Sequence, residues 1–394
     1  MPRTSKDLRL SERVLRIEEE PFHIALDLPL GVLRLTGGEP DFPTAPFVVE
    51  AANRAASEGQ THYTPSEGLL ALREGISRKL KAENSVSYDP REIIVTPGSS
   101  AAVTLLLLAL IDPGDEILLP DPAWFHYSTL IELVGGVPKR IGLDPRDGFQ
   151  LHASNIEKIA TAKTKAIILN NPSNPVGRVL SRKELEEAAA AAERLNITVV
   201  SDEIYEKIVY PPNIHASICS LPGMKERSIL INGFSKGYAM MGWRLGYLAA
   251  PKELARKMGA LLGYSLVCPN SVAQHAGIEA LANPRSTEYK DMMLKAWDRR
   301  RKVVMEYVSA SSTLSAKNPE GTFYGWVNVS KSGLDGAGAA KWVLKEENVG
   351  VMPGNLFGQN GKDYVRISFA TSDDVVDQGM KKLCRSLDQY KKNH

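Results

Sequence analysis

The chain has 394 residues, of which 43% are hydrophobic and 24% charged, so it is long enough for two domains with buried cores and is not of a disordered type. Its formal net charge of +2 gives no electrostatic reason to expect binding to nucleic acid or to a membrane surface. Three cysteines far apart in the sequence (Cys219, Cys268 and Cys384) exclude a disulfide framework, and the seven histidines form no HxxxH pair, so we expect no metal site.

The N-terminal 15 residues are polar and charged, without the apolar core of a secretory leader. The longest apolar run, near residues 103–111, is too short to span a bilayer and is typical of a buried helix. Together with the unpaired cysteines, these features predict a protein of the reducing cytoplasm.

Residues 1–43 are predicted to form an N-terminal arm that also supplies part of a small domain. Its charged first part, residues 8–20, is expected to be helical. The arm ends in Gly37-Gly38-Glu39-Pro40-Asp41-Phe42-Pro43, where two glycines and two prolines indicate a loop that enters the main domain.

Residues 44–286 are predicted to form a large domain in which strands and helices alternate. Short apolar or β-branched runs indicate strands at residues 92–96, 116–120, 166–170, 197–201, 228–231 and 245–249. Apolar or amphipathic segments indicate helices at residues 47–57, 68–82, 99–111, 124–134, 182–195, 252–262 and 272–282. This alternation predicts an α/β fold: right-handed βαβ units build a mainly parallel sheet between two helical layers.

Residues 287–394 are predicted to form a smaller α+β domain. It begins with a long charged helix over residues 287–310 and ends with a helix over residues 372–387. Between them, strands are expected at residues 322–329, 349–352 and 364–369, and a further helix at residues 336–346.

Ligands of such sheets bind at the carboxyl ends of the strands, and several polar groups follow those ends here. The first strand is followed by Pro97-Gly98-Ser99-Ser100 at a helix start, which can hold a phosphate with free amides and the helix dipole. A plain serine N-cap explains the same residues equally well. The next strand is followed by Trp124, which offers a flat aromatic plane.

The central strands end in an amide, an acid, a phenol and a lysine. Asn174 lies in the polar turn after one strand, and Asp202 and Tyr205 follow the next. A carboxylate at a buried strand end is costly unless it meets a cation or a donor. Lys236 follows the strand after that, and desolvation there would favour its neutral, nucleophilic form. Arg244 follows eight residues later and keeps its charge, which suits a phosphate.

One cofactor needs this whole set of groups at one sheet edge. Pyridoxal 5'-phosphate requires a lysine for its aldehyde, a carboxylate for its ring nitrogen, donors for its phenolate oxygen and cations for its phosphate. Core packing can explain any single member, but it does not explain all of them at successive strand ends. The sequence therefore predicts a pyridoxal-phosphate site.

The chain resembles the class I and II aminotransferases of the fold-type I pyridoxal-phosphate superfamily, from about Gly37 to the C-terminal helix. Within the family it is most similar to the branch of prokaryotic aspartate and archaeal aromatic aminotransferases. The resemblance rests on Gly38-Glu39-Pro40-Asp41-Phe42, Tyr63-Thr64-Pro65-Ser66-Glu67-Gly68, Asn171-Pro172-Ser173-Asn174-Pro175, Ser201-Asp202-Glu203-Ile204-Tyr205, residues 236–244, Pro353-Gly354-Asn355-Leu356-Phe357-Gly358 and Val365-Arg366-Ile367-Ser368.

The resemblance implies the chemistry. It predicts a homodimer with ping-pong kinetics, in which Lys236 forms an aldimine with the cofactor and then moves a proton between the substrate α-carbon and the cofactor. The catalytic residues are expected to be Lys236, Asp202, which pairs with the ring nitrogen, and Tyr205, which binds the ring oxygen. The cofactor-binding residues are expected to be Tyr63 from the neighbouring subunit, Gly98, Ser99, Ser100, Trp124, Asn174, Asp202, Tyr205, Lys236 and Arg244. Substrate binding is expected at Gly38, Trp124, Asn174 and Arg366, with Arg366 holding the α-carboxylate.

Three departures from the family pattern bear on phosphate and substrate binding. Gly233 stands where many relatives have a phosphate-binding serine. Residues 260–264 lack the arginine that holds a distal carboxylate in one branch, and Ser100 stands where another branch has a lysine. These absences favour a neutral or aromatic substrate, with aspartate still possible. The run Glu18-Glu19-Glu20 is interpreted as a solvated helix face, the alternative being selection of a basic substrate.

Three other functions stay open at this point. A pyridoxal-phosphate lyase or decarboxylase would share the cofactor site but break another bond. A non-catalytic regulator with an aminotransferase-like domain would need a DNA-binding segment, for which the 35 or so residues of the arm are too few. A nicotinamide enzyme is disfavoured because no GxGxxG follows the first strand.

Overall fold

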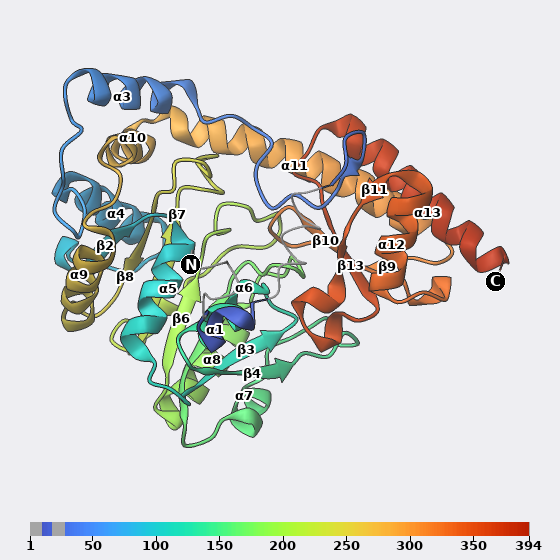
Figure 1. The fold of residues 1–394 in the computed structure, drawn as a ribbon, viewed down its shortest axis with the longest axis horizontal. Coiled ribbons are helices and arrows are strands. Elements are labelled where there is room, and N and C mark those ends of the chain that lie inside the picture. Colours follow the sequence, from blue (N-terminus) through green and yellow to red (C-terminus); the bar gives the residue numbers. More distant parts are fainter. Residues whose placement is uncertain (1–9, 18–27, 394) are drawn as a thin grey trace, which may run out of the picture.

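The computed structural model describes residues 10–17 and 28–393 and divides their strands among three sheets (Figure 1). The largest sheet has seven strands in the order β2-β8-β7-β6-β5-β3-β4. These strands are β2 (Ile93–Thr96), β3 (Glu116–Asp121), β4 (Val137–Gly142), β5 (Thr164–Asn170), β6 (Thr198–Asp202), β7 (Ser228–Gly233) and β8 (Gly246–Ala249). Strand β8 runs in the direction opposite to the other six strands, which are parallel to one another, so the predicted mainly parallel sheet is confirmed.

Apolar side chains cover both faces of this sheet, and most residues of its central strands are buried. Successive residues of β5 illustrate the alternation: Ile167 and Leu169 pack on one face, and Ala166 and Ile168 on the other. The first face carries α3 (Pro46–Ser57), α4 (Leu70–Glu83), α7 (Ala153–Ile159), α8 (Arg182–Leu195) and α10 (Ser271–Ala282). The second carries α5 (Ser99–Leu110), α6 (His126–Leu133) and α9 (Lys252–Leu266). The predicted three-layer αβα arrangement follows.

The C-terminal part of the chain forms a second unit around a four-stranded antiparallel sheet, with the order β12-β13-β10-β9. Its strands are β9 (Ser315–Ala316), β10 (Tyr324–Asn328), β12 (Met352–Pro353) and β13 (Tyr364–Ser368). Its helices are α11 (Arg285–Ala310), α12 (Gly336–Glu347) and α13 (Asp373–Asn393), and α11 runs across the molecule from the first unit to the second (Figure 1). A separate parallel pair joins β1 (Leu33–Arg34) to β11 (Val349–Gly350).

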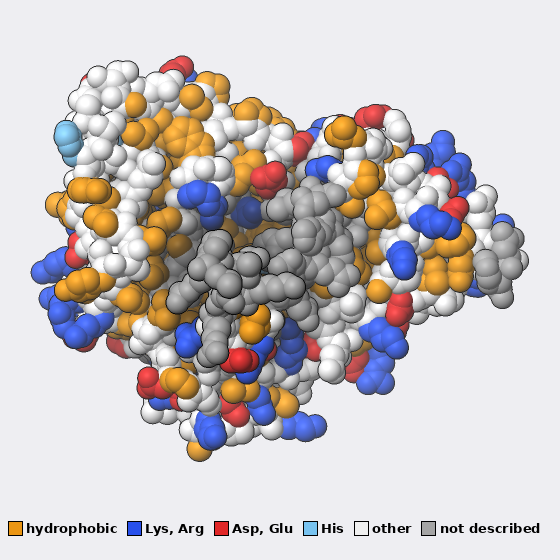
Figure 2. All heavy atoms as spheres, viewed as in Figure 1, with side chains coloured by type: hydrophobic (Ala, Val, Ile, Leu, Met, Phe, Trp, Pro, Cys, Tyr) orange, Lys and Arg blue, Asp and Glu red, His pale blue; other side chains and the backbone are white. Residues whose placement is uncertain are grey.

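Short 3-10 helices connect several of these elements: η2 (Pro90–Glu92), η3 (Ile218–Ser220), η4 (Ser330–Ser332), η5 (Gly354–Phe357) and η6 (Gln359–Gly361). We propose domain boundaries near residues 43 and 286, since α11 begins at Arg285 and β1 pairs with a strand of the second unit. None of the helices within residues 10–17 and 28–393 is long and apolar enough to cross a membrane. On the face in Figure 2, basic and acidic side chains are interspersed, in keeping with the small net charge.

The predicted elements differ from the structure at several places, and the strand expected at residues 349–352 is in fact two short strands in different sheets, β11 and β12. The helix expected over residues 8–20 is limited, within the described part of the arm, to α1 (Glu12–Leu15), an exposed four-residue turn without a side-chain cap. Such a short helix buries nothing, and propensity alone does not extend it. Strand β4 and helix α7 were not predicted. Strand β4 is an edge strand whose Pro138-Lys139-Arg140 segment lacks an apolar run, so it carries no hydrophobic signal.

Candidate active site

A cavity of about 550 Å³ lies at the carboxyl ends of the central strands, where the second unit meets the first. The predicted site residues that line it are Gly38, Ser99, Ser100, Trp124, Asn174, Asp202, Tyr205, Lys236, Arg244 and Arg366. Residues separated by more than 300 positions, such as Gly38 and Arg366, therefore meet at one place. Of the other predicted residues, Gly98 lies against Arg244, whereas Tyr63 is outside the lining and 85% exposed.

Lys236 lies three residues beyond β7, and its Nζ donates a hydrogen bond to the carbonyl oxygen of Gly38. Burial lowers the pKa of this ammonium to about 8; Glu39 opposes the shift and Arg244 adds to it. An amine whose pKa is close to neutrality has a reactive neutral fraction under ordinary conditions. Lys236 is therefore suited to attack an aldehyde and to exchange protons.

Asp202 ends β6 and is 3% exposed. It accepts hydrogen bonds from the hydroxyl of Tyr127 at 2.6 Å and from the backbone amide of Ile204 at 3.2 Å. Burial raises the pKa of this carboxyl to about 6, although the bond from Tyr127 opposes the rise. A buried carboxylate in this state gains from a nearby cation, which a protonated ring nitrogen would supply.

Arg366, on β13, is 4% exposed and directs its guanidinium into the cavity wall. Its Nη1 donates to Asn174 Oδ1 at 3.0 Å and its Nη2 to the Thr36 carbonyl at 2.9 Å, while its buried Nε has no partner. Within residues 10–17 and 28–393, no acidic side chain forms an ion pair with it. A buried guanidinium without a counter-ion is a receptor for a carboxylate.

The turn between β2 and α5 packs tightly against Arg244. Gly98 has a φ of 83°, and a Cβ at this residue would lie 2.5 Å from Arg244 Nη2. A Cβ at Gly246 would lie equally close to the backbone amide of Ser99, at 2.5 Å. These glycines let helix-start amides and a guanidinium approach one another, which is the donor set that a phosphate requires.

The same packing explains the glycine at position 233. A Cβ there would lie 3.1 Å from both Gly246 Cα and the carbonyl oxygen of Leu245, so a serine would require β8 to move away by a few tenths of an ångström. Ser235, two residues later, lines the cavity instead. The close approach of β7 and β8 therefore favours a glycine at this position.

The structure adds cavity residues that the sequence analysis missed, above all Tyr127, Asn170 and Tyr324. Tyr127 lies three positions after Trp124, and their rings meet edge to face at 5.2 Å, so the helical spacing was an available signal. Asn170 connects two site residues, since its Nδ2 donates to the Asp202 carbonyl at 3.1 Å and its Oδ1 accepts from the Asn174 amide at 2.8 Å. The run Glu18-Glu19-Glu20 lies outside the described residues.

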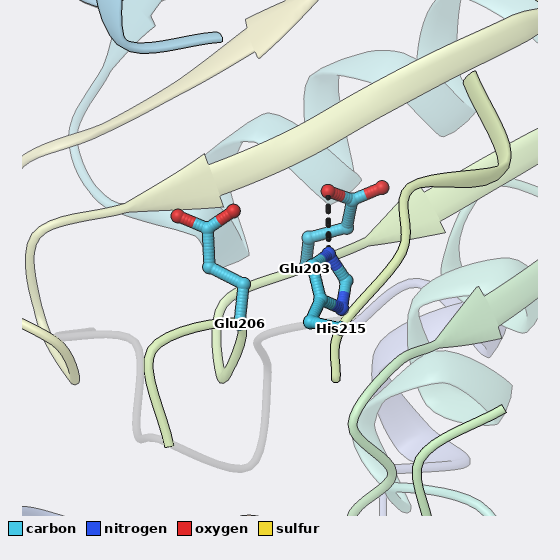
Figure 3. Close-up of side chains that lie close together, drawn as sticks. All are labelled: Glu203, Glu206 and His215. Carbon is cyan, nitrogen blue, oxygen red and sulfur yellow. Dashed lines mark hydrogen bonds and ion pairs between the residues drawn. The ribbon is translucent and has the colours of Figure 1, made fainter. Parts of the chain in front are cut away.

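A second polar cluster, Glu203, Glu206 and His215, is buried next to the end of β6 (Figure 3). Glu203 is fully buried and accepts four hydrogen bonds, from Ser201 Oγ, Asn84 Nδ2, His215 Nε2 and Ser217 Oγ. Glu206 pairs with Lys79 Nζ and also accepts from Asn84 Nδ2 at 2.6 Å. The three side chains are close enough to one another to ligate a metal ion. However, the carboxylates of Glu203 and Glu206 already accept hydrogen bonds from protein donors, so we interpret the cluster as structural.

Comparisons with known proteins agree with this geometry. The family model described as aminotransferase class I and II matches residues 31–383. An aspartate aminotransferase of Pyrococcus abyssi is 38% identical over 388 residues, covering 98% of this chain and all of that one. An aromatic-amino-acid aminotransferase of Thermococcus litoralis is 36% identical over 388 residues, covering 98% of this chain and all of that one. The crystal structure of an aromatic aminotransferase from Pyrococcus horikoshii matches with a TM-score of 0.91 at 39% identity, covering 96% of this chain and 98% of that one.

Proposed function

The chain belongs to the class I and II aminotransferases, a family of pyridoxal-phosphate enzymes, and we propose that Lys236 holds the cofactor while an L-amino acid and a 2-oxo acid exchange an amino group. One observation carries this proposal: a lysine whose pKa is lowered and a carboxyl whose pKa is raised share one cavity with a buried arginine that has no acidic partner among the described residues. The relatives named as aminotransferases favour transamination over the lyase, the regulator and the nicotinamide enzyme considered from the sequence.

The cavity fits the cofactor by its donor set. Ser99, Ser100 and the Gly98 turn with Arg244 would hold the phosphate, and Asp202 would pair with the ring nitrogen. The hydroxyl of Tyr205 and the side-chain NH2 group of Asn174 would donate hydrogen bonds to the ring oxygen. The Trp124 ring would stack on the cofactor ring. When bound, the cofactor supplies an aldehyde for Lys236 and a ring that stabilises negative charge on the substrate α-carbon.

The protein then contributes binding, orientation and proton transfer. Arg366 would bind the substrate α-carboxylate in a bidentate pair, next to Asn174 and the Gly38 backbone. Lys236 Nζ, once released from the cofactor, would remove the α-proton and return it at the other carbon as general base and acid. Asp202 would keep the ring nitrogen protonated, which would increase the withdrawal of negative charge from the substrate α-carbon.

The substrate side chain is proposed to be neutral or aromatic. Phe125 and Met352 supply apolar surface in the cavity lining, and Ser100 offers no charge to a second carboxylate. One observation favours aspartate as a second candidate, because the exposed Arg34 also lines the cavity. Relatives of both substrate classes are similar to this chain.

We also propose a homodimer with a shared active site in the cytoplasm. Tyr63 and Tyr264 are 85% and 96% exposed, and large aromatic side chains left in water support burial against a second subunit. In such a dimer Tyr63 would reach the partner's phosphate site. Cys219, Cys268 and Cys384 are free, which supports a reducing compartment.

Replacement of the cofactor lysine tests the proposal. Lys236→Ala protein should lack the visible absorbance of a lysine-bound cofactor and lose at least about four orders of magnitude of turnover. Lys183→Ala, which removes an exposed lysine, is the matched control and should retain both properties. Retention of turnover and absorbance by Lys236→Ala would contradict the assignment.

A half-reaction screen tests the substrate class. Single amino acids are added to the cofactor-loaded enzyme, and loss of the visible band reports transfer of the amino group to the cofactor. Rapid conversion by aromatic or neutral amino acids is expected. Rapid conversion by aspartate alone would replace that proposal with the second candidate and direct attention to Arg34.

A further inference from the structure

We propose that Tyr324 is a positioning residue with two roles. It directs the hydroxyl proton of Tyr205 toward the cofactor ring oxygen, and its ring fixes the orientation of the Arg366 guanidinium by stacking against it. This inference rests on the proposed function, because it assigns Tyr205 to the cofactor and Arg366 to the substrate carboxylate. Tyr324 comes from β10 in the second unit, whereas Tyr205 follows β6 in the first. The contact therefore joins the two halves of the site.

The first part of the proposal rests on a buried pair of hydroxyl groups. The oxygens of Tyr205 and Tyr324 are 3.0 Å apart, and the two residues are 5% and 1% exposed. Either oxygen could be the donor in the protein alone. Each hydroxyl has a single proton, so if Tyr205 donates to the cofactor, Tyr324 must donate to Tyr205.

The second part rests on the stacking of Arg366. Its guanidinium carbon lies 4.2 Å from the centre of the Tyr324 ring and 5.0 Å from the centre of the Phe357 ring. Two aromatic faces orient a guanidinium without consuming its N–H donors, which stay available for a carboxylate. Tyr324 thus contacts the substrate-binding arginine and the cofactor-binding tyrosine at once.

The position of Tyr324 is set by the turn that precedes β10. Thr322 has a φ of 63°, and its Oγ1 accepts a hydrogen bond from the Tyr324 amide at 3.2 Å. The Thr322 carbonyl accepts from the buried hydroxyl of Tyr210 at 2.7 Å. A Cβ at Gly38 would lie 3.4 Å from the Tyr324 hydroxyl, so the loop that holds Lys236 also approaches this group.

A chain of hydrogen bonds has a measurable consequence. A donor that itself accepts a hydrogen bond is strengthened, so Tyr324 would make Tyr205 a better donor to the negatively charged ring oxygen. With the cofactor held at Lys236, that oxygen would carry more negative charge at high pH than at low pH. A stronger donor therefore lowers the pH at which the visible band of the loaded enzyme titrates.

The test is a pH titration of that band without substrate. Tyr324→Phe keeps the ring beside Arg366 and removes only the hydroxyl. It is expected to raise the titration midpoint by about 0.2–0.6 pH unit, from a strengthening of roughly a tenth to a third of a charge-assisted hydrogen bond. In the Tyr205→Phe background the same substitution should leave the midpoint unchanged. Tyr88→Phe, the control, removes a buried hydroxyl that lies outside the cavity lining and should not shift the midpoint.

Two further variants keep each part falsifiable. Incorporation of 3-fluorotyrosine at position 324 makes the hydroxyl a stronger donor and should lower the midpoint. Tyr324→Leu removes the ring as well, and it should raise the KM of the amino acid about 2- to 30-fold relative to Tyr324→Phe, as expected for loss of a stacked cation.

The outcomes separate this inference from the proposed function. If the wild-type enzyme has no visible band, the assignment of Lys236 fails and this inference fails with it. If the band is present but Tyr324→Phe leaves its midpoint unchanged, or shifts it equally with and without the Tyr205 hydroxyl, only the role of Tyr324 in directing the Tyr205 proton is overturned. Equal KM values for the Phe and Leu variants would overturn its role in holding Arg366.

Discussion

Asp202 and Glu203 are consecutive acidic residues at the end of β6, and their surroundings are opposite in kind. Asp202 lines the cavity, and burial raises its pKa to about 6 despite the hydrogen bond from Tyr127. Glu203 belongs with Glu206 and His215 to the second polar cluster, which together with Lys79 we call the closed cluster; Figure 3 shows the first three side chains. Four donors contact the Glu203 carboxylate. Two consecutive residues therefore differ in their surroundings. Asp202 faces the cavity with a raised pKa, whereas Glu203 faces the protein interior with its carboxylate fully hydrogen-bonded.

The same contrast separates the basic residues of the two regions. Arg366 in the cavity is buried without an acidic partner among the described residues, and burial lowers its pKa. Lys79 in the closed cluster pairs with Glu206. Burial alone would raise the pKa of Glu206, but Lys79 and other nearby cations lower it to about 2. We infer that the closed cluster stabilises the end of β6, whereas Asp202 and Arg366 in the cavity gain their charged partners from the cofactor and the substrate.

The comparison is tested most strongly at Asp202. Asp202→Asn is expected to lower turnover by about 10²- to 10³-fold or more, because it removes a charge aimed at the reacting ring. Steady-state kinetics with saturating cofactor measures this. A kcat equal to that of the wild type would contradict the proposed role of Asp202 in pairing with the ring nitrogen.

The stability of the cofactor-free variant should change in the opposite direction. A carboxyl whose folded pKa lies above its ordinary 3.8 destabilises the fold at pH above about 6, and this penalty disappears as the pH falls toward 3.8. Cofactor-free Asp202→Asn is therefore expected to be more stable than the wild type by about 1–3 kcal/mol at pH 7. Chemical denaturation at pH 7 and at pH 4 measures the difference, and a loss of stability at pH 7 would contradict the account.

Arg366→Lys tests the open cation. A lysine keeps the charge but cannot form the bidentate pair, so kcat/KM for the amino acid is expected to fall about 10- to 150-fold. The control is the visible band of the loaded enzyme, which should form normally because the cofactor does not depend on this contact. An unchanged kcat/KM would mean that the α-carboxylate binds elsewhere.

Lys79→Met tests the closed region and should affect turnover least. Removing one partner of a buried pair leaves Glu206 without compensation, so unfolding at pH 7 is expected to become easier by about 3–5 kcal/mol. The lowered pKa of Glu206 means that this contribution is present above pH 4.5 and lost as the pH falls toward 2. Lys81→Met, on the same helix but exposed, is the control. A large loss of turnover in folded Lys79→Met would erase the distinction between the two regions.

The sequence predicted the parts of the fold whose signals are local. Buried strands such as β5 have apolar runs, and the groups that follow them share one sheet edge by topology, so Asp202 and Lys236 could be expected at one site. Strand β4 has no such run and was missed. Tyr324 was missed because its contacts with Tyr205 and Arg366 depend on how two sheets dock, which no spacing encodes.

The direct measurement of the central claim is the site of covalent attachment. The cofactor-loaded enzyme is reduced with borohydride, digested and analysed by mass spectrometry. The account predicts a phosphopyridoxyl group on Lys236, the lysine whose pKa burial lowers to about 8, and no visible band after reduction. Stoichiometric labelling of another lysine, with Lys236 unmodified, would contradict it.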